Sequence, residues 1–225
     1  MIQEIKCRRD ISIEQLEYLL IAEDKDCLEM LREEAVQTAQ KIYGNQVFIR
    51  GLIEFTNYCK NDCYYCGIRR SNHCADRYRL TKEEILSCTD TGYELGFRTF
   101  VLQGGEDPYF TDARICELVS EIRQKHPDCA ITLSIGEKSK ESYKRYFDAG
   151  ADRYLLRHET ANGTHYRRLH PDELSLEHRK QCLLDLKEIG YQVGCGFMVG
   201  SPGQTTETLY EDLQFIRELM PHMVG

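Results

Sequence analysis

The sequence contains no long apolar run. No stretch of its 225 residues approaches the roughly 20 consecutive apolar residues of a membrane-spanning helix. Residues Met1 to Asp10 also lack the apolar core of a signal peptide. These absences exclude a membrane partner, and we expect a soluble protein whose default location is the cytoplasm.

Basic charge is scarce as well. The chain carries 29 Lys and Arg against 37 Asp and Glu, a formal net charge of -8 at pH 7. Proteins that bind a nucleic-acid backbone draw their affinity from a basic face, so the charge balance disfavours nucleic-acid partners, RNA-modification substrates included. Linkers, low-complexity segments and internal repeats are missing too, which favours one large domain.

Disulfide-like cysteine spacing is also missing. The 11 cysteines are an odd number, and apart from one group of three they stand singly along the chain. This distribution is typical of reduced thiols in a reducing compartment and not of a secreted, disulfide-stabilised domain.

The one group of cysteines lies in the loop 59–66, where Cys59, Cys63 and Cys66 form a C-x3-C-x2-C pattern. Three thiolates are one ligand short for a cubane 4Fe–4S cluster, so one iron stays open for a cofactor or substrate. This spacing is the signature of radical S-adenosylmethionine (SAM) enzymes. One alternative is a zinc site in which His73 or Cys74 joins the Cys63–Cys66 pair, although a second C-x2-C pair is missing.

Secondary-structure signals divide the chain near residue 45. Two N-terminal helices are predicted from capping boxes, Ser12 with Gln15 and Asp26 with Glu29, and the second helix ends at Gly44. Residues 1–45 are therefore expected to form a helical segment that precedes a core of residues 46–225.

Strand-like and helix-like segments alternate through this core. We predict strands near 47–55, 97–103, 130–135, 152–158 and 191–199. We predict helices near 81–95, 111–125, 139–149, 175–189 and 205–220. Such β/α repetition folds as a parallel sheet, either doubly wound or closed into a barrel.

Charged residues on one face of the strands favour the barrel. The faces that helices can cover are apolar and include Val47, Ile49, Ile53, Phe55, Tyr154 and Leu156, and the alternate residues are polar. The predicted inner-face residues include Arg50, Glu54, Gln103, Thr132, Ser134, Arg153, Arg157, Glu159, Gly194, Gly196 and Met198. Helices on both faces would bury these charges at a cost of several kcal/mol each unless they were paired. A hollow polar lumen avoids this cost. The alternative is a self-satisfied ion network of the arginines and glutamates.

The loops that follow the strands are polar or rich in glycine, and in a barrel they meet at the C-terminal rim where active sites lie. Gly104-Gly105-Glu106-Asp107 directly follows the second strand and resembles the GGE motif that holds the methionyl amino group of SAM. Glycine lets backbone carbonyls approach the ammonium, and a nearby carboxylate would add complementary charge.

Several motifs together resemble the biotin-synthase-like group of radical SAM enzymes, and within it the FeFe-hydrogenase maturase HydE. The motifs are the cysteine loop, Gln103-Gly104-Gly105-Glu106-Asp107-Pro108, Leu133-Ser134-Ile135-Gly136-Glu137, Arg157-His158-Glu159-Thr160 and Gly200-Ser201-Pro202-Gly203. The resemblance covers residue 46 to the end. It implies an α/β fold, a partial TIM-type (β/α) barrel with N-terminal helices. Family members continue beyond the start of the sixth strand, where this chain stops, so the barrel is expected to be incomplete.

The resemblance also implies a set of site residues. The cluster ligands are Cys59, Cys63 and Cys66. The SAM-binding residues are Gly104, Gly105, Glu106, Ser134, Arg157, Glu159, Arg179, Met223 and Tyr65. The residues of the substrate cavity are Arg50, Gln103, Thr132, Arg153 and Met198. No side-chain acid or base is implied.

The implied function is reductive cleavage of SAM at a 4Fe–4S cluster in the maturation of the FeFe-hydrogenase H-cluster. The implied partners are a small-molecule or organometallic substrate, a flavodoxin- or ferredoxin-type reductant and other hydrogenase maturases. Two alternatives stay open at this point. One is an enzyme like biotin synthase or methylornithine synthase, and the other is a noncatalytic zinc- or cluster-binding scaffold.

Overall fold

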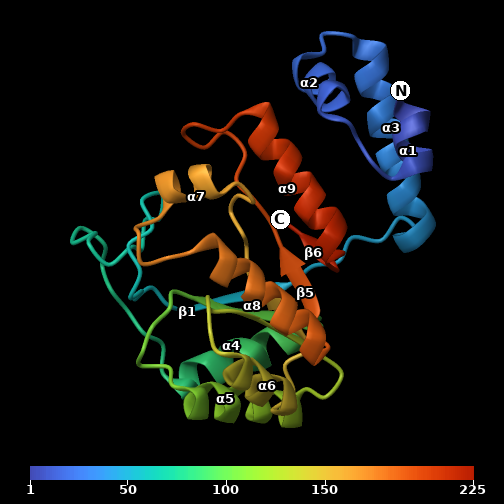
Figure 1. The fold of residues 1–225 in the computed structure, drawn as a ribbon. Coiled ribbons are helices and arrows are strands. Elements are labelled where there is room, and N and C mark those ends of the chain that lie inside the picture. The colour runs from blue at the N-terminus through green and yellow to red at the C-terminus, as the bar shows by residue number, and fades with distance from the viewer.

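A computed structural model describes residues 1–225, and its centre is one parallel sheet of six strands in chain order, β1-β2-β3-β4-β5-β6 (Figure 1). The strands are β1 (Gly51–Thr56), β2 (Thr99–Gly104), β3 (Ala130–Ser134), β4 (Arg153–Leu155), β5 (Gln192–Cys195) and β6 (Met223–Val224). This order, in which each strand pairs with the next, is that of a barrel wall, and it confirms the predicted fold class.

Nine helices accompany the sheet. They are α1 (Ile2–Arg8), α2 (Ile13–Ile21), α3 (Lys25–Tyr43), α4 (Lys82–Glu94), α5 (Asp112–Lys125), α6 (Lys140–Asp148), α7 (Gly163–Leu169), α8 (Leu176–Ile189) and α9 (Thr206–Leu219). The five helices predicted in the core match α4, α5, α6, α8 and α9 to within one residue at each end. None of the helices is long and apolar enough to cross a membrane.

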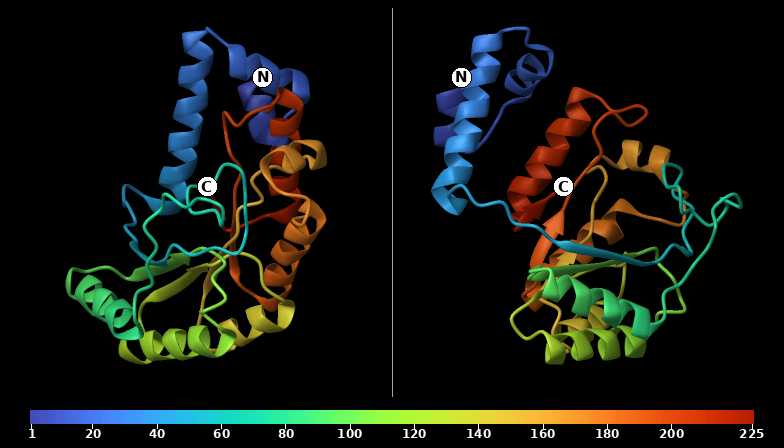
Figure 2. Two further views of the ribbon diagram at one scale, coloured as in Figure 1. Left: turned by 90° about the vertical axis from the view of Figure 1, so that its left-hand side faces the viewer. Right: turned by 180° about the vertical axis from the view of Figure 1, so that it is seen from behind.

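The hydrophobic core lies between one face of the sheet and the helices α4, α5, α6 and α8, as Figure 1 and the rear view of Figure 2 show. Leu102, Ile131, Leu133, Tyr154 and Val193 are fully buried on this face. Because strand side chains alternate, the residues between them point to the inner face of the barrel wall. The predicted division into an apolar outer face and a polar inner face is confirmed for β2 to β5.

The first strand is shorter than predicted. It begins at Gly51, which pairs with Phe100 near the start of β2, so residues 47–49 extend past the beginning of their neighbour and have no strand to pair with. Val47, Phe48 and Ile49 are accordingly 87%, 65% and 61% exposed. The prediction that Val47 and Ile49 face the helices was wrong for this reason.

The N-terminal segment differs from its prediction in two respects. It contains three helices and not two, because α1 precedes the predicted pair. The capping box at Ser12 is confirmed, but α3 is capped by Asp24, whose carboxylate accepts hydrogen bonds from the amides of Asp26 and Cys27 at 3.1 and 3.2 Å. Figure 2 shows these helices beside α9, which α2 contacts. The boundary at residue 45 stays a prediction.

The short helix α7 escaped prediction. Its N-cap is Asn162, whose side chain accepts a hydrogen bond from the amide of His165 at 2.8 Å. With seven residues it is too short to show a helical apolar period. It inserts a turn between β4 and α8 and reaches the cysteine loop, where the carbonyl of Leu169 accepts a hydrogen bond from the amide of Tyr64 at 2.9 Å.

Two adjacent leucines on α8 test this packing. Leu183 is fully buried, whereas Leu184 is 48% exposed. We expect Leu183→Ala to lower the free energy of unfolding by about 2–5 kcal/mol, because it leaves a cavity under the sheet. Leu184→Ala, the matched control, should cost less than about 1 kcal/mol. Urea unfolding measures both, and equal losses would contradict the placement of α8.

Candidate functional site

The three cysteines lie in a loop that follows β1 at the C-terminal rim. The β1–β2 pairing shifts register between Glu54 and Thr56, and this bulge bends the strand just before the loop. Cys59, Cys63 and Cys66 are free thiols of intermediate burial. Arg77 organises the loop from within, because its guanidinium donates only to backbone carbonyls. These belong to Asn57, Ile68, Arg69 and Asn72, the last three at 2.9, 2.7 and 3.0 Å.

Glycines let the cysteine loop lie directly on the rim of β2. A Cβ atom on Gly105 would come within 2.2 Å of the Tyr58 carbonyl oxygen and 2.7 Å of the Cys59 Cβ. A Cβ on Gly104 would lie 2.7 Å from the Thr56 methyl group. The Gly-Gly pair is therefore a steric requirement for docking the loop against β2, whatever else its carbonyls contact.

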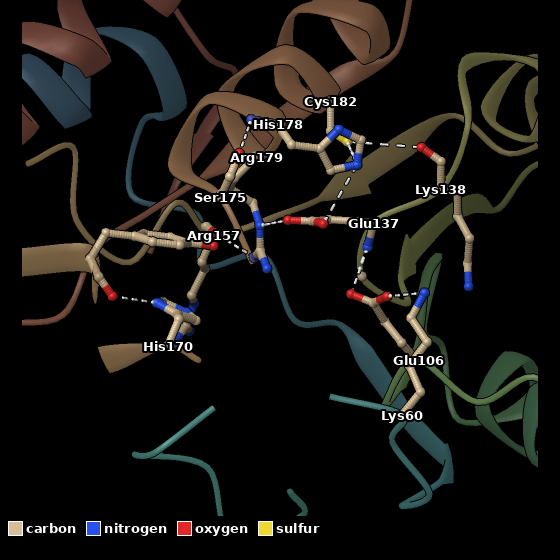
Figure 3. Close-up of polar contacts among 12 residues, drawn as sticks. Lys60, Glu106, Glu137, Lys138, Arg157, His170, Ser175, His178, Arg179 and Cys182 are labelled. Carbon is tan, nitrogen blue, oxygen red and sulfur yellow. Dashed lines mark hydrogen bonds and ion pairs between the residues drawn. The ribbon is translucent and has the colours of Figure 1, made fainter. Parts of the chain in front are cut away.

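A chain of charged side chains, buried except for Lys60, joins the loops that follow β1, β2 and β3 to α8, as Figure 3 shows. The carboxylate of Glu106 pairs with Lys60 of the cysteine loop at 3.2 Å and accepts a hydrogen bond from the amide of Glu137 at 2.9 Å. Glu137 in turn forms a buried ion pair with Arg179. Glu106 therefore uses its carboxylate on protein groups, and its predicted contact with SAM stays a prediction.

Arg179 also connects this chain of charges to the strand β4. Its Nη1 donates to the carbonyl oxygen of Arg157 at 2.9 Å. Two residues further on, Glu159 has φ of 65°, a left-handed conformation that non-glycine residues rarely adopt. Its amide donates to Gly196 and its carbonyl accepts from Met198, both at 3.0 Å. The neighbouring strand thus imposes the conformation that carries Arg157 and Glu159 along the rim.

A cavity of about 360 Å³ opens inside the rim beside the cysteine loop. Its lining includes Glu54, Thr56, Tyr65, Cys66, Gln103, Gly104, Ser134, Gly136, Leu155, Arg157, Glu159 and Arg179. The structure therefore brings together six of the predicted SAM-binding residues, namely Tyr65, Gly104, Ser134, Arg157, Glu159 and Arg179. Of the cysteines, Cys66 lines this cavity, and the predicted SAM-binding residues Gly105, Glu106 and Met223 do not.

Four of the five predicted substrate-cavity residues lie outside this lining. Thr132 is 1% exposed, and its hydroxyl has no hydrogen-bond partner. Arg50 and Arg153 lie at the opposite, N-terminal end of the strands, where Arg50 contacts the Met223 sulfur at 3.4 Å and Arg153 donates to Gln192 at 2.7 Å. Met198 follows β5 on the rim and does not line the cavity. Of the predicted substrate residues, Gln103 alone faces the cavity, where it donates to Glu54 at 3.1 Å.

One alternative drawn from the sequence is wrong. Arg50 contacts the Met223 sulfur and Arg153 donates to Gln192, and neither of them nor Arg157 forms an ion pair with Glu54 or Glu159. A self-satisfied ion network is therefore not what fills the lumen. No three His, Cys, Asp or Glu side chains, the three cysteines of the loop included, are gathered as ligands of one metal ion. The zinc site with His73 or Cys74 therefore stays an alternative for experiment.

Comparison with known protein families identifies the superfamily of this chain. Residues 53–216 match the radical SAM superfamily. The chain belongs to the radical SAM superfamily.

The radical SAM chain is similar to two groups of characterised relatives. It is 46% identical over 218 residues to FeFe-hydrogenase maturase subunit HydE of Thermotoga maritima. The alignment covers 97% of this chain and 62% of the relative. It is 32% identical over 196 residues to 3-methylornithine synthase of Methanosarcina barkeri, which covers 86% of this chain and 55% of the relative. The chain thus spans less than two thirds of the length of either relative.

Solved structures agree on the fold. The crystal structure of methylornithine synthase PylB superposes with a TM-score of 0.88 at 31% identity, over 96% of this chain and 63% of that one. The FeFe-hydrogenase maturase HydG superposes with a TM-score of 0.85 at 26% identity, over 99% of this chain and 52% of that one. The partial barrel of this radical SAM chain is therefore one that several solved relatives share.

The donor set of the radical SAM chain fits a 4Fe–4S cluster, because three free cysteines of one loop offer a thiolate to each of three irons. Burial raises the pKa of the Cys63 thiol to about 11, an effect that Arg179 opposes and the neighbouring Cys59 and Cys66 reinforce. A metal cation that binds such a thiol favours its deprotonated form.

Several side chains of the site had no signal in the sequence. Asp107, which was given no role of its own, accepts hydrogen bonds from Arg79 at 2.7 and 2.9 Å and from Thr56 at 2.8 Å, which fastens the cysteine loop to β2. His170 lies at the end of α7, and its Nε2 is 3.2 Å from the Tyr65 hydroxyl. Lone arginines and histidines in loops carry no period or motif, so only the folded contacts identify them.

The close packing of Gly105 generates a test with a matched control. We expect Gly105→Ala to displace Tyr58 and Cys59 and so to lower iron incorporation during anaerobic reconstitution several-fold. Gly67→Ala changes the same loop at a position where an added Cβ meets nothing within 4 Å, and it should load iron normally. Iron and sulfide analysis measures both. Normal loading of the Gly105 variant would show that the loop does not depend on this contact.

The buried His170 predicts a dependence of stability on pH. Burial lowers its pKa from 6.5 to about 4. The fold thus favours the neutral ring. The contribution of His170 to the free energy of unfolding is therefore complete above pH 6.5 and falls by up to about 3 kcal/mol as the pH drops from 6.5 towards 4. The difference in unfolding free energy between wild type and His170→Leu should shrink over this range. A difference that stays constant with pH would contradict the prediction.

Proposed function

We propose that the chain is a radical SAM enzyme in which Cys59, Cys63 and Cys66 hold a 4Fe–4S cluster and the adjoining cavity binds SAM. The observation that carries this proposal is the opening of Cys66 into a cavity that Arg157, Glu159 and Gly104 also line. When bound, the cluster supplies the electron that cleaves the sulfonium of SAM into methionine and a 5′-deoxyadenosyl radical.

The chain's own residues would bind and orient the cofactor. The guanidinium cation of Arg157 suits the carboxylate of a ligand, and the Glu159 carboxylate can accept hydrogen bonds from hydroxyl or ammonium groups of that ligand. Burial raises the pKa of Glu159, whereas Arg179 and Arg157 partly offset this effect. The backbone of Gly104 borders the same cavity and can approach a ligand because it has no side chain. No acid or base from the protein is required at this step.

The substrate would lie deeper in the lumen, towards Arg50 and Arg153. Burial lowers the pKa of Arg153, and the nearby Arg50 cation lowers it as well, and neither arginine forms an ion pair with a carboxylate. Two uncompensated guanidiniums favour an anionic substrate. An anionic organometallic species, handled during maturation of the FeFe-hydrogenase H-cluster, fits this preference, and the 46% identity to a HydE sequence supports it.

The proposed partners follow from the chemistry. A protein of the flavodoxin or ferredoxin type would deliver the electron, and other hydrogenase maturases would supply or receive the substrate. Because the chain spans 62% of its HydE relative, the activity of these 225 residues by themselves is part of the proposal. An activity like that of methylornithine synthase is the second candidate, since the PylB structure superposes with a TM-score of 0.88.

Anaerobic reconstitution tests the proposal. We expect the chain to take up about four irons, to turn brown, and to form 5′-deoxyadenosine from SAM under a strong reductant. Cys59→Ser, Cys63→Ser and Cys66→Ser should each lose the cluster and the product. Cys88→Ser, at an exposed cysteine elsewhere, should retain both. A colourless protein that binds zinc, or equal cluster loading in all four variants, would refute the proposal.

A further inference from the structure

His170 stands at the point where α7 meets the cysteine loop. It is the C-cap of α7, and its ring is 1% exposed. The ring stacks on Tyr166 with centroids 3.9 Å apart and meets Tyr65 edge-on with centroids 5.3 Å apart. Its Nε2 lies 3.2 Å from the Tyr65 hydroxyl. A histidine that the sequence did not single out thus contacts an aromatic residue of the candidate cofactor cavity.

The hydrogen bonds fix which nitrogen of His170 carries the proton. Nδ1 lies 3.1 Å from the carbonyl oxygen of Tyr166, and a carbonyl oxygen can only accept. Nδ1 is therefore protonated and donates. The neutral ring then has its lone pair on Nε2, so the Tyr65 hydroxyl is the donor in the second hydrogen bond. This assignment follows from the partners and requires no titration.

The direction of this hydrogen bond matters for Glu159. Burial raises the pKa of the Glu159 carboxylate and is the larger effect, but the nearby Tyr65 hydroxyl lowers that pKa as a hydrogen-bond donor, and both residues line the same cavity. A hydroxyl has one proton to donate. His170 and Glu159 therefore compete for the proton of Tyr65, and the 3.2 Å hydrogen bond to His170 limits its donation to Glu159.

We propose that His170 is a positioning residue for SAM binding, which acts through the Tyr65 hydroxyl by holding the phenol ring at the cavity wall and limiting donation of its proton to Glu159. This inference rests on the proposed function, because it names SAM as the ligand of the cavity. Without His170 the hydroxyl turns towards Glu159, and the ring loses the partner that fixes it.

A double-mutant cycle on the reconstituted chain tests the inference. Isothermal titration under anaerobic conditions gives the Kd for SAM in wild type, His170→Leu, Tyr65→Phe and the double variant. We expect each single change to raise Kd by roughly three- to tenfold, the loss of one hydrogen bond. The double variant should bind like Tyr65→Phe, because His170 has no hydroxyl left to hold. His170→Gln, which keeps an acceptor, should restore part of the affinity.

His126 supplies a matched control. It is the C-cap of α5, is 7% exposed and stacks on Tyr93 with centroids 4.4 Å apart, yet it lines no part of this cavity. His126→Leu should leave the Kd for SAM unchanged. Additive effects of His170→Leu and Tyr65→Phe, or an equal effect of His126→Leu, would reduce His170 to a stabilising residue and overturn the inference. Failure of wild type to bind SAM would instead refute the proposed function, and the inference with it.

A spectroscopic measurement on the full chain is independent of cofactor binding. Nitrogen-15 NMR of labelled histidines should show His170 as the neutral ring with its proton on Nδ1. Tyr65→Phe should shift the Nε2 resonance of His170 towards that of a free lone pair and leave His126 unchanged. This test survives even where His170→Leu fails to fold, because it uses the native histidine. A proton on Nε2 in wild type would overturn the inference.

Discussion

The buried ion pair between Glu137 and Arg179 is the interaction on which the rim of this barrel depends. Arg179 comes from α8 and Glu137 from the loop after β3, and their remaining contacts reach Arg157 and Glu106. The chain of contacts continues through Lys60 into the cysteine loop. A buried charge that loses its partner costs about 3–5 kcal/mol, so these contacts are coupled and not independent. One arginine thereby sets the relative positions of the loops that follow four of the strands.

The sheet tolerates this polar rim because its inner face is left unfilled. An ordinary (β/α)8 barrel packs its interior with branched apolar side chains. At Gly194 of β5 the Leu155 side chain fills the space, since an added Cβ would lie 2.8 Å from it, whereas a cavity of about 360 Å³ stays open beside the cysteine loop. Leu133, Tyr154 and Val193 on the outer face supply the core. The outer face of the strands therefore forms the hydrophobic core, and the inner face of the same strands carries the candidate site.

Alternation and capping are local properties, which is why the sequence predicted the core helices, the parallel sheet and the polar inner face. Asn162 and the seven residues of α7 were missed because a helix of two turns has too few positions to show a period. Arg77, Asp107 and His170 were missed because their roles consist of contacts with distant backbone or side chains. The arginines of the lumen were predicted to be inside, but the cavity beside the cysteines contains Arg157 and not Arg50 or Arg153. The alternation of residues along a strand predicts which face of the sheet a side chain occupies, but it does not predict how far along the barrel axis that side chain lies.

The cysteine loop is held by protein groups at several points, which bears on how a cluster could enter it. Metal sites are rarely preformed in an unfolded chain, so metal binding usually supplies the energy that orders the ligands. Here the planar guanidinium of Arg77 satisfies carbonyls on both sides of the cysteines, and Arg79 ties the far end of the loop to Asp107. The arginine fork is rigid and always charged, so these bonds do not vary with pH in the physiological range. The backbone can therefore be ordered before the iron arrives, which leaves cluster binding to orient only the three thiols.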